Sequence, residues 1–393
     1  MSKQDAWLLP QGIEELLPAA AKRLDDLHRK LIDQMNGWGY ELVMTPFVDY
    51  MESLLIGSGN DLKLQTFRLT DQVSGRQMGI RADMTPQVAR MDAHQLRRET
   101  PTRLCYIGTV LHTLPDAFGS SRSPMQCGAE LYGSSSVESD VEVIRLMLAT
   151  LAATNLQGVH IDIAHVGIFG GLVAQAGLNV EQESLFFDAL QRKAIPEIDT
   201  LLAQWTLDAD CQKMLRALVD LNGGAEVLTE AKQQLSKADA KVQASLENLC
   251  NIIEQLQTLV TDVPLFIDLA ELRGYHYHTG VMFDAYVEGH GQAVAWGGRY
   301  DDIGGVFGNA RPATGFSTDL KRLLSLTTAS EEARDVIFAP AEIDADCQQM
   351  IDSLRANGEC VVCALPGQVG GAKEMDCSRI LKKQKGQWQV IAV

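Results

Sequence analysis

The sequence lacks a long hydrophobic run. None of its stretches approaches the roughly 20 apolar residues that a membrane-spanning helix needs. The first residues, Met1 to Asp5, do not follow the charged-then-apolar pattern of a signal peptide. We therefore expect a cytoplasmic protein that does not contact a membrane. The 393 residues suffice for two or three domains, and 46% hydrophobic with 22% charged residues is ordinary for a globular protein.

Basic residues are also scarce. The chain has 34 lysines and arginines against 51 aspartates and glutamates, so its formal net charge is -17. Nucleic-acid binding draws its affinity from lysine and arginine contacts to phosphates. The charge balance therefore argues against a nucleic-acid partner.

The eight cysteines do not have the spacing of a disulfide framework, which predicts reduced and mostly buried thiols. Cys360 and Cys363 form a CxxC, but residues 359–365 have the pattern of one apolar strand. No second CxxC or CxxH completes a tetrahedral zinc site. We interpret the pair as two core cysteines, and we expect neither a metal nor a cofactor.

Helical and strand patterns alternate along the chain and predict an α+β protein built on a mostly antiparallel sheet. A segment of about residues 180–260 is rich in Leu, Ala, Gln, Glu and Lys and reads as a helical insertion. The other expected elements are a helix at 13–38, a strand at 40–45, short strands from 67 to 133, a helix at 138–155, a strand at 159–166, strands from 265 to 298, a helix near 316–327, and a strand-helix-strand-helix tail after 334.

Three polar segments are candidates for a binding site. In the first, Asp83 and Thr85 are two residues apart; in extended chain their side chains point the same way, and both can accept from an ammonium group. In the second, Gln126 and Glu130 share one face of a strand, where a polar ligand could satisfy them. The alternatives are a turn with a helix N-cap for the first and a strand with a solvated face for the second.

The third segment, Arg273 to His278, places one arginine, two tyrosines and two histidines within six residues. Arginine recognises carboxylates through two parallel hydrogen bonds, and tyrosine or histidine can contact an imidazole. A metal site at His276 and His278 is less favoured, because no third ligand is evident nearby.

In order and spacing, these segments resemble the catalytic domain of histidyl-tRNA synthetase, a class II aminoacyl-tRNA synthetase, over roughly residues 1–326. Residues 39–46 look like class II motif 1, the strand through which these enzymes dimerise. Residues 81–85 are similar to the family's Arg-Pro-Glu-Gly-Thr, and residues 273–280 to its histidine-specific Arg-Gly-Leu-Asp-Tyr-Tyr-Thr-Gly. The resemblance implies an antiparallel sheet flanked by helices.

The same resemblance implies a histidine site. Its acidic residue and threonine would hold the α-amino group, its arginine the carboxylate, and the remaining side chains the imidazole. Carried onto this sequence, the site comprises Asp83, Thr85, Gln126, Glu130, Arg273, Tyr277 and His278, with Arg122 and Tyr275 as further candidates.

The nucleotide-binding motifs depart from the family. Where motif 2 has Phe-Arg-x-Glu, this chain has His112 and Leu114 in place of the arginine and the glutamate. Where motif 3 has Gly-Leu-Glu-Arg, it has Asp319 and Lys321. Losing a charge aimed at a transferring phosphoryl group typically costs several kcal/mol of transition-state stabilisation, so we expect neither adenylate formation nor any catalytic residue.

The C-terminal segment, residues 334–393, is also smaller than the synthetase's anticodon-binding domain, which has on the order of 100 residues. A chain with the amino-acid site kept, the ATP motifs altered and the C-terminal segment shortened resembles the paralogue family of regulatory subunits of short-form ATP phosphoribosyltransferase. That resemblance implies a homodimer through motif 1, a complex with a short catalytic subunit, and histidine feedback on the first step of histidine biosynthesis. A divergent active histidyl-tRNA synthetase and a free-standing histidine sensor are the alternatives.

Overall fold

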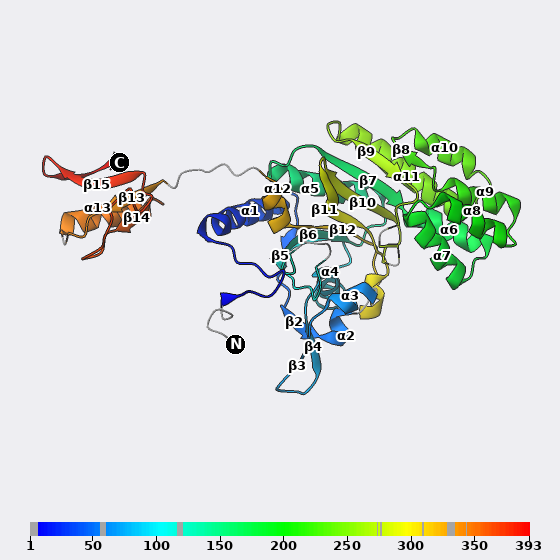
Figure 1. Ribbon diagram of the computed structural model, residues 1–393, viewed down its shortest axis with the longest axis horizontal. Coiled ribbons are helices and arrows are strands. Elements are labelled where there is room, and N and C mark those ends of the chain that lie inside the picture. Colours follow the sequence, from blue (N-terminus) through cyan, green and yellow to red (C-terminus); the bar gives the residue numbers. More distant parts are fainter. Residues whose placement is uncertain are drawn as a thin grey trace. The chain divides into compact units, whose positions relative to one another are not determined.

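A computed structural model describes residues 7–55, 60–115, 121–272, 274–275, 277–308, 310–327, 335–342 and 344–393 (Figure 1). Two candidate residues of the sequence analysis, Arg273 and His276, lie outside this described part. The chain divides into two compact units, Met1–Thr327 and Thr328–Val393. Within the described residues, no helix is both long and apolar enough to cross a membrane.

The first unit is built on a nine-stranded sheet with the order β1-β5-β6-β12-β11-β10-β7-β9-β8. The five central pairings, from β5 through to β7, are antiparallel, whereas β1 pairs with β5 and β9 with β7 in parallel. The strands are β1 Glu41–Leu42, β5 Thr102–Thr109, β6 Met125–Tyr132, β7 Val159–His165, β8 Asn222–Gly223, β9 Leu265–Asp268, β10 Val281–Val287, β11 His290–Arg299 and β12 Ala313–Asp319. The expected mostly antiparallel sheet is confirmed.

Helices cover one face of this sheet. Apolar residues of β6, such as Cys127 and Ala129, pack there against Ile144 and Met147 of α5 (Val137–Ala153). Helix α1 (Pro18–Gly37) packs on α5 and on α12 (Leu320–Leu326). The helix expected near 316–327 therefore begins later, because residues up to Asp319 pair with β6 and β11.

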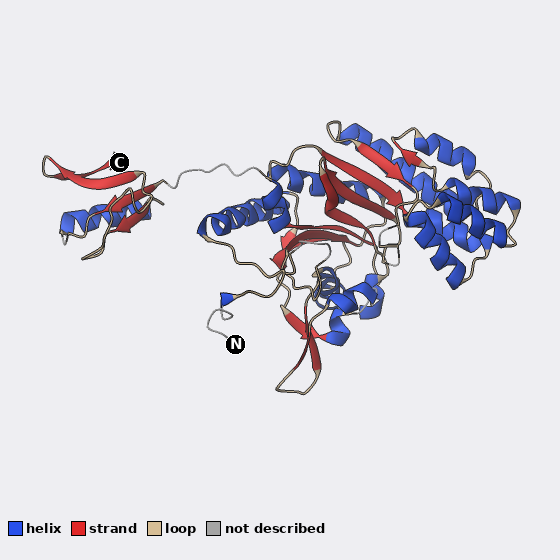
Figure 2. Cartoon of the chain, viewed as in Figure 1, coloured by secondary structure: helices blue, strands red, loops and turns tan. Residues whose placement is uncertain are grey.

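The segment from 180 to 260 is helical as expected, apart from the two-residue strand β8. Its helices gather at the β7–β9 end of the sheet together with α6, and Figure 2 shows them in blue beside the strands. They are α6 Val166–Ala176, α7 Val180–Gln191, α8 Ile195–Gln204, α9 Ala209–Ala217, α10 Val227–Gln234 and α11 Ala240–Leu259. Helix α11 buries Val242, Leu246 and Leu249, a helical repeat of apolar residues, against the core.

A small three-stranded sheet, ordered β2-β4-β3, precedes the first candidate segment. Its elements and their neighbours are β2 Val48–Tyr50, α2 Met51–Leu54, α3 Asn60–Gln65, β3 Arg68–Thr70, β4 Gln77–Ile80, α4 Thr85–Arg90 and the π-helical turn η2 Met91–Leu96. The buried guanidinium of Arg81 donates to the Thr109 carbonyl at 2.9 Å and to the Thr45 carbonyl at 2.8 Å. These bonds fix the chain that leads into α4.

The second unit has a four-stranded sheet ordered β14-β13-β15-β16. Its elements are β13 Val336–Ala339, α13 Ala345–Ala356, β14 Cys360–Cys363, β15 Arg379–Gln384 and β16 Gln387–Ala392. The final helix that we predicted is wrong, because β15 and β16 form a hairpin around Lys385 and Gly386, both at positive φ. The prediction that the CxxC holds two core cysteines is confirmed for Cys363, which packs against the core, and wrong for Cys360, which is exposed.

Candidate functional site

A group of hydrogen-bonded polar side chains lies on the sheet face opposite α5. They come from the start of α4, from β5, β6 and β12, and from the turn after β11. We call this group the polar cluster; its members are Asp83, Thr85, Tyr106, Gln126, Glu130, Tyr300 and Ser317.

Glu130 is the innermost member of the cluster, and its side chain is only 1% exposed. The Tyr106 hydroxyl donates to Oε1 at 2.9 Å, and the Tyr300 hydroxyl donates to Oε2. Burial outweighs these two donors and raises the pKa of Glu130 to about 8. The carboxyl is therefore mostly protonated at neutral pH in the unliganded protein.

Two glycines leave space for the side chains of Glu130 and Tyr106. A Cβ atom at Gly315, which pairs with Glu130 across β12 and β6, would overlap the Oε2 oxygen of Glu130. A Cβ atom at Gly128 would overlap the Tyr106 hydroxyl. Both positions need a residue without a side chain, because the neighbouring polar groups approach the strand backbone closely.

Gln126 joins the first two candidate segments. Its Nε2 donates to Asp83 Oδ1 at 2.7 Å and to Ser317 Oγ at 2.9 Å, while its Oε1 accepts from the Met84 amide at 2.8 Å. Asp83 Oδ1 also accepts from the amide of Thr85 at 3.0 Å. The aspartate thus shapes the turn into α4 and at the same time lies in the polar cluster, so the predicted turn is present and a binding role for Asp83 stays a prediction.

Tyr277 borders the cluster. Its ring stacks on that of Tyr300, with centroids 5.2 Å apart and planes 25° apart. Its buried hydroxyl has no hydrogen-bond partner among the described residues. Burial, together with the carboxylates of Asp83 and Glu130, raises the pKa of Tyr277 well above its usual value. An unsatisfied buried hydroxyl costs about 1–3 kcal/mol, which marks this position as one that a polar ligand group could complete.

His278 follows Tyr277 and meets its ring edge-on at 5.3 Å. Burial lowers the pKa of His278 to about 4, so the imidazole is neutral at pH 7. Its Nδ1 lies 3.1 Å from the Gly274 carbonyl, which assigns the proton to Nδ1 and leaves Nε2 as an acceptor.

Two further candidates lie apart from the cluster. The Tyr275 hydroxyl donates to Glu183 of α7 at 3.0 Å, and its ring packs edge-on against Phe169 of α6 at 5.0 Å. Arg122 donates to the carbonyls of His112 and Gln11, both at 3.0 Å. In the described structure Tyr275 therefore anchors the segment to the helices, and Arg122 holds the N-terminal residues.

Three of the four substituted motif positions make structural contacts. His112 Nε2 lies 2.9 Å from the Ala82 carbonyl, whereas Leu114 is 66% exposed. Asp319 caps α12 by accepting from the Lys321 amide at 3.0 Å, and the Lys321 ammonium donates to the Ser123 carbonyl at 2.6 Å. The arginine and the glutamate that class II motif 2 uses for ATP are therefore replaced here by a histidine and a leucine.

Reasoning from sequence missed Tyr106, Tyr300 and Ser317. Tyr106 stands opposite Gly128 in the β5–β6 register, and Ser317 stands opposite the same glycine from β12. Tyr300 directly follows the last residue of β11, Arg299, and its side chain reaches Glu130 on β6. No set of three His, Cys, Asp or Glu side chains suited to a metal ion occurs in the described part of the chain.

The chain is similar to known proteins over nearly its whole length. The family model "Histidyl-tRNA synthetase" matches residues 12–323, and "ATP phosphoribosyltransferase subunit HisZ C-terminal domain" matches residues 334–391. ATP phosphoribosyltransferase regulatory subunits from Pseudomonas fluorescens (strain Pf0-1) and Thioalkalivibrio sulfidiphilus are 56% and 54% identical to this chain over 392 residues, each comparison covering 99% of both chains.

Solved structures show the same fold. A Bacillus halodurans structure, described as an ATP phosphoribosyltransferase regulatory subunit/histidyl-tRNA synthetase, matches with a TM-score of 0.84 at 27% identity and covers 94% of this chain and 95% of its own. Histidyl-tRNA synthetase from Nostoc sp. PCC 7120 matches with a TM-score of 0.78 at 18% identity, covering 98% of this chain and 97% of its own, and supports the class II fold alone.

Proposed function

The chain belongs to the family of ATP phosphoribosyltransferase regulatory subunits, and from this premise we propose that its polar cluster binds histidine and thereby controls a catalytic partner. As a regulatory subunit it has a non-catalytic role in histidine biosynthesis. The observation that carries the ligand proposal is the buried Glu130, held by two tyrosines beside the unsatisfied Tyr277 hydroxyl.

The ligand is placed by the chemistry of each group. Asp83 and the Thr85 hydroxyl accept from the α-ammonium group, and Arg273 pairs with the α-carboxylate. Gln126, Glu130, Tyr277 and His278 surround the imidazole, whose two nitrogens need one donor and one acceptor. Because Glu130 is buried, a replacement that cannot take up or release a proton to match the imidazole leaves a mismatched hydrogen bond in a place that water does not reach. Arg122 and Tyr275 contribute indirectly, through the segments that they hold.

Aminoacylation is lost in this proposal. No arginine or glutamate is present at these two positions for ATP. The His112 ring instead contacts the Ala82 carbonyl, and the Leu114 side chain is exposed. Binding of the amino acid then no longer leads to its activation. What remains is a ligand-dependent conformational equilibrium, in which histidine acts by binding one assembly state more tightly than another.

The partner is the short catalytic subunit of ATP phosphoribosyltransferase, which this chain activates and through which histidine feedback acts on the first step of the pathway. The chain itself forms a homodimer through the motif 1 region. Exposed apolar residues there support this contact, since Leu42 is 38%, Met44 83% and Phe47 44% exposed. A cytoplasmic location remains a prediction from the sequence.

Isothermal titration of the purified chain with histidine tests the ligand. We expect binding, and a loss of at least about tenfold in affinity for Glu130→Gln, the size expected when a buried hydrogen-bonding group loses its proper partner. Glu247→Gln, the same change at an exposed position of α11, is the matched control and should bind as the wild type does.

Mixing with the catalytic subunit tests the regulation. The chain should accelerate phosphoribosyl transfer, and histidine should reduce that acceleration. Histidine-dependent ATP–pyrophosphate exchange by the purified chain would support an active synthetase and contradict the proposal. Histidine binding without any effect on the catalytic subunit would support a free-standing sensor instead.

A further inference from the structure

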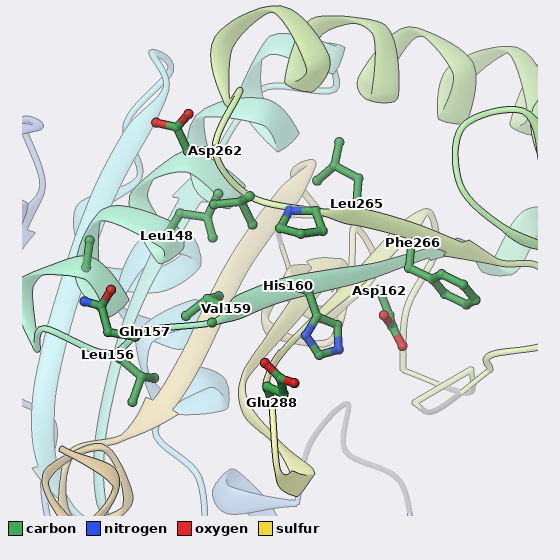
Figure 3. A pocket seen from close by; sticks show the side chains of 14 residues that line it. Leu148, Leu156, Gln157, Val159, His160, Asp162, Asp262, Leu265, Phe266 and Glu288 are labelled. Carbon is green, nitrogen blue, oxygen red and sulfur yellow. The ribbon is translucent and has the colours of Figure 1, made fainter. Parts of the chain in front are cut away.

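A second feature with the character of a binding site lies at the β7–β9 end of the sheet. It is a pocket of about 760 Å³ between the end of α5, strands β7 and β9, and the β10–β11 turn (Figure 3). We call it the edge pocket; its lining includes Leu148, Leu156, Asp162, Asp262, Phe266 and Glu288. Strands β11 and β10 separate β12 of the polar cluster from β7, so about 14 Å of sheet lies between the two sites.

The charge of the edge pocket is of one sign. Asp162 of β7, Asp262 before β9 and Glu288 of the β10–β11 turn all line it, and no lysine or arginine does. None of the three carboxylates forms an ion pair with a lysine or arginine within the described structure; Asp262 accepts only from the neighbouring Thr261 hydroxyl, at 3.2 Å. Three carboxylates from three separate elements, none in an ion pair with a lysine or arginine of the described structure, attract a cationic group.

The walls between these carboxylates are apolar. Leu148 and Leu156 line one side, and Phe266 remains 37% exposed at the other. Asp162 and Phe266 are register partners on the parallel strands β7 and β9, so their side chains leave the same face of the sheet. In Figure 3 Asp162 lies beside the Phe266 ring, and Asp262 lies at the far side of the pocket.

A carboxylate beside an aromatic ring is suited to a guanidinium group, which forms two hydrogen bonds to the carboxylate and packs its flat face on the ring. His160 also lines the pocket on the side of Asp162, and its ring stacks on that of Tyr286 with centroids 5.7 Å apart. A free small cation would use the carboxylates but would leave the leucine walls uncovered. A side chain carried on an apolar segment covers both.

We propose that the edge pocket is the docking site for the catalytic subunit, which inserts an arginine from an otherwise apolar segment between Asp162 and Phe266. The proposal rests on the proposed function, because that function supplies the partner. It places docking and histidine binding on different strands of one sheet. The effect of histidine bound at β6 and β12 is then transmitted to the partner through β11 and β10. These two strands connect the sites by continuous hydrogen bonding.

The test is the affinity of the full chain for the short catalytic subunit. The double variant Asp262→Lys with Glu288→Lys reverses two charges at a loop and a turn. We expect its affinity to fall by at least about tenfold at low salt, because opposed like charges at an interface are strongly unfavourable. The affinity for histidine should not change. Glu230→Lys with Glu247→Lys, at exposed positions of α10 and α11, introduces the same net charge elsewhere and should bind as the wild type does.

Phe266→Ala provides a second test that introduces no charge. It should weaken the complex while leaving much of its salt dependence, whereas the double lysine variant should lose most of that dependence. If the wild type binds the catalytic subunit and both variants bind it equally well, the docking proposal is wrong and the proposed function stands. If the wild type does not bind at all, both fail. If the variants instead dissociate the homodimer in analytical ultracentrifugation, the edge pocket is a contact between copies, which also overturns the proposal.

Discussion

Replacing Glu130 with glutamine should change the pH dependence of stability in a defined way. Burial raises the pKa of Glu130 from the ordinary 4.5 to about 8. Between these two values the folded protein holds a proton that the unfolded chain releases. The contribution of Glu130 to the free energy of unfolding is therefore greatest below pH 4.5, falls as the pH rises, and stops falling above pH 8. The slope attributable to this one group is about 1.4 kcal/mol per pH unit.

Worked to neutral pH, this amounts to about 3 kcal/mol of unfolding free energy between pH 4.5 and pH 7. The carboxyl is 1% exposed, so solvent screening does not reduce the figure much. Glutamine keeps the shape of the side chain and a carbonyl acceptor but does not titrate. The wild type should lose stability relative to Glu130→Gln by roughly this amount across the interval.

The assay is urea unfolding followed by tryptophan fluorescence at several pH values from 5 to 8, without histidine. Only the difference between the two proteins is used, so titrations shared by both cancel. Glu247→Gln, at an exposed position, should keep the wild-type slope, because Glu130 is intact in it. Parallel pH profiles for the wild type and Glu130→Gln would refute the reasoning, since they would mean that Glu130 ionises alike in the folded and unfolded chain.

Three further predictions concern the packing around the site. Gly315→Ala should lower the unfolding free energy by about 1–3 kcal/mol in a urea titration, because the new methyl group overlaps Glu130, and histidine binding should weaken with it. Tyr277→Phe should leave the unliganded protein as stable or slightly more stable in thermal unfolding, since it removes a hydroxyl without a described partner, yet lower the affinity for histidine about tenfold in calorimetry. Asp140→Asn leaves the buried Arg299, now paired at 2.9 Å, without its main charge partner and should cost about 3–5 kcal/mol in the same urea titration; an unchanged midpoint would show that the remaining acceptors compensate.

The two halves of the proposed function rest on different kinds of observation. The proposed loss of ATP use rests on substitutions that are visible in the sequence, and the structure adds the contacts that the substituted side chains make. Lys321, for example, donates to the Ser123 carbonyl and pairs with Glu14 at 3.2 Å, so it fastens the N-terminal segment to α12. The binding proposal rests on burial and hydrogen bonding, which appear only when distant segments come together.

Local patterns determined much of the fold. The alternation along 125–131 gives the two faces of β6, and the helical composition of 180–260 gives the insertion, because both depend on periods of a few residues. The same local rules fail at the C-terminus, where they predict a helix but residues 379–392 form the β15–β16 hairpin around Lys385 and Gly386. Strand and helix periods are hard to separate in so short a polar segment.

By itself, the sequence determined the residue types of the site and the loss of the ATP motifs, since identity at a matched position needs no coordinates. Only the tertiary structure decided which polar groups meet. Tyr106 and Tyr300 reach Glu130 from strand and turn positions 24 and 170 residues away in the chain, and this burial is what raises its pKa. Tyr275 and Tyr277 are two residues apart but lie in different surroundings. Tyr275 packs on α6 and α7, whereas Tyr277 packs on Tyr300. Strand neighbours and burial are properties of the whole sheet, so no window of sequence contains them.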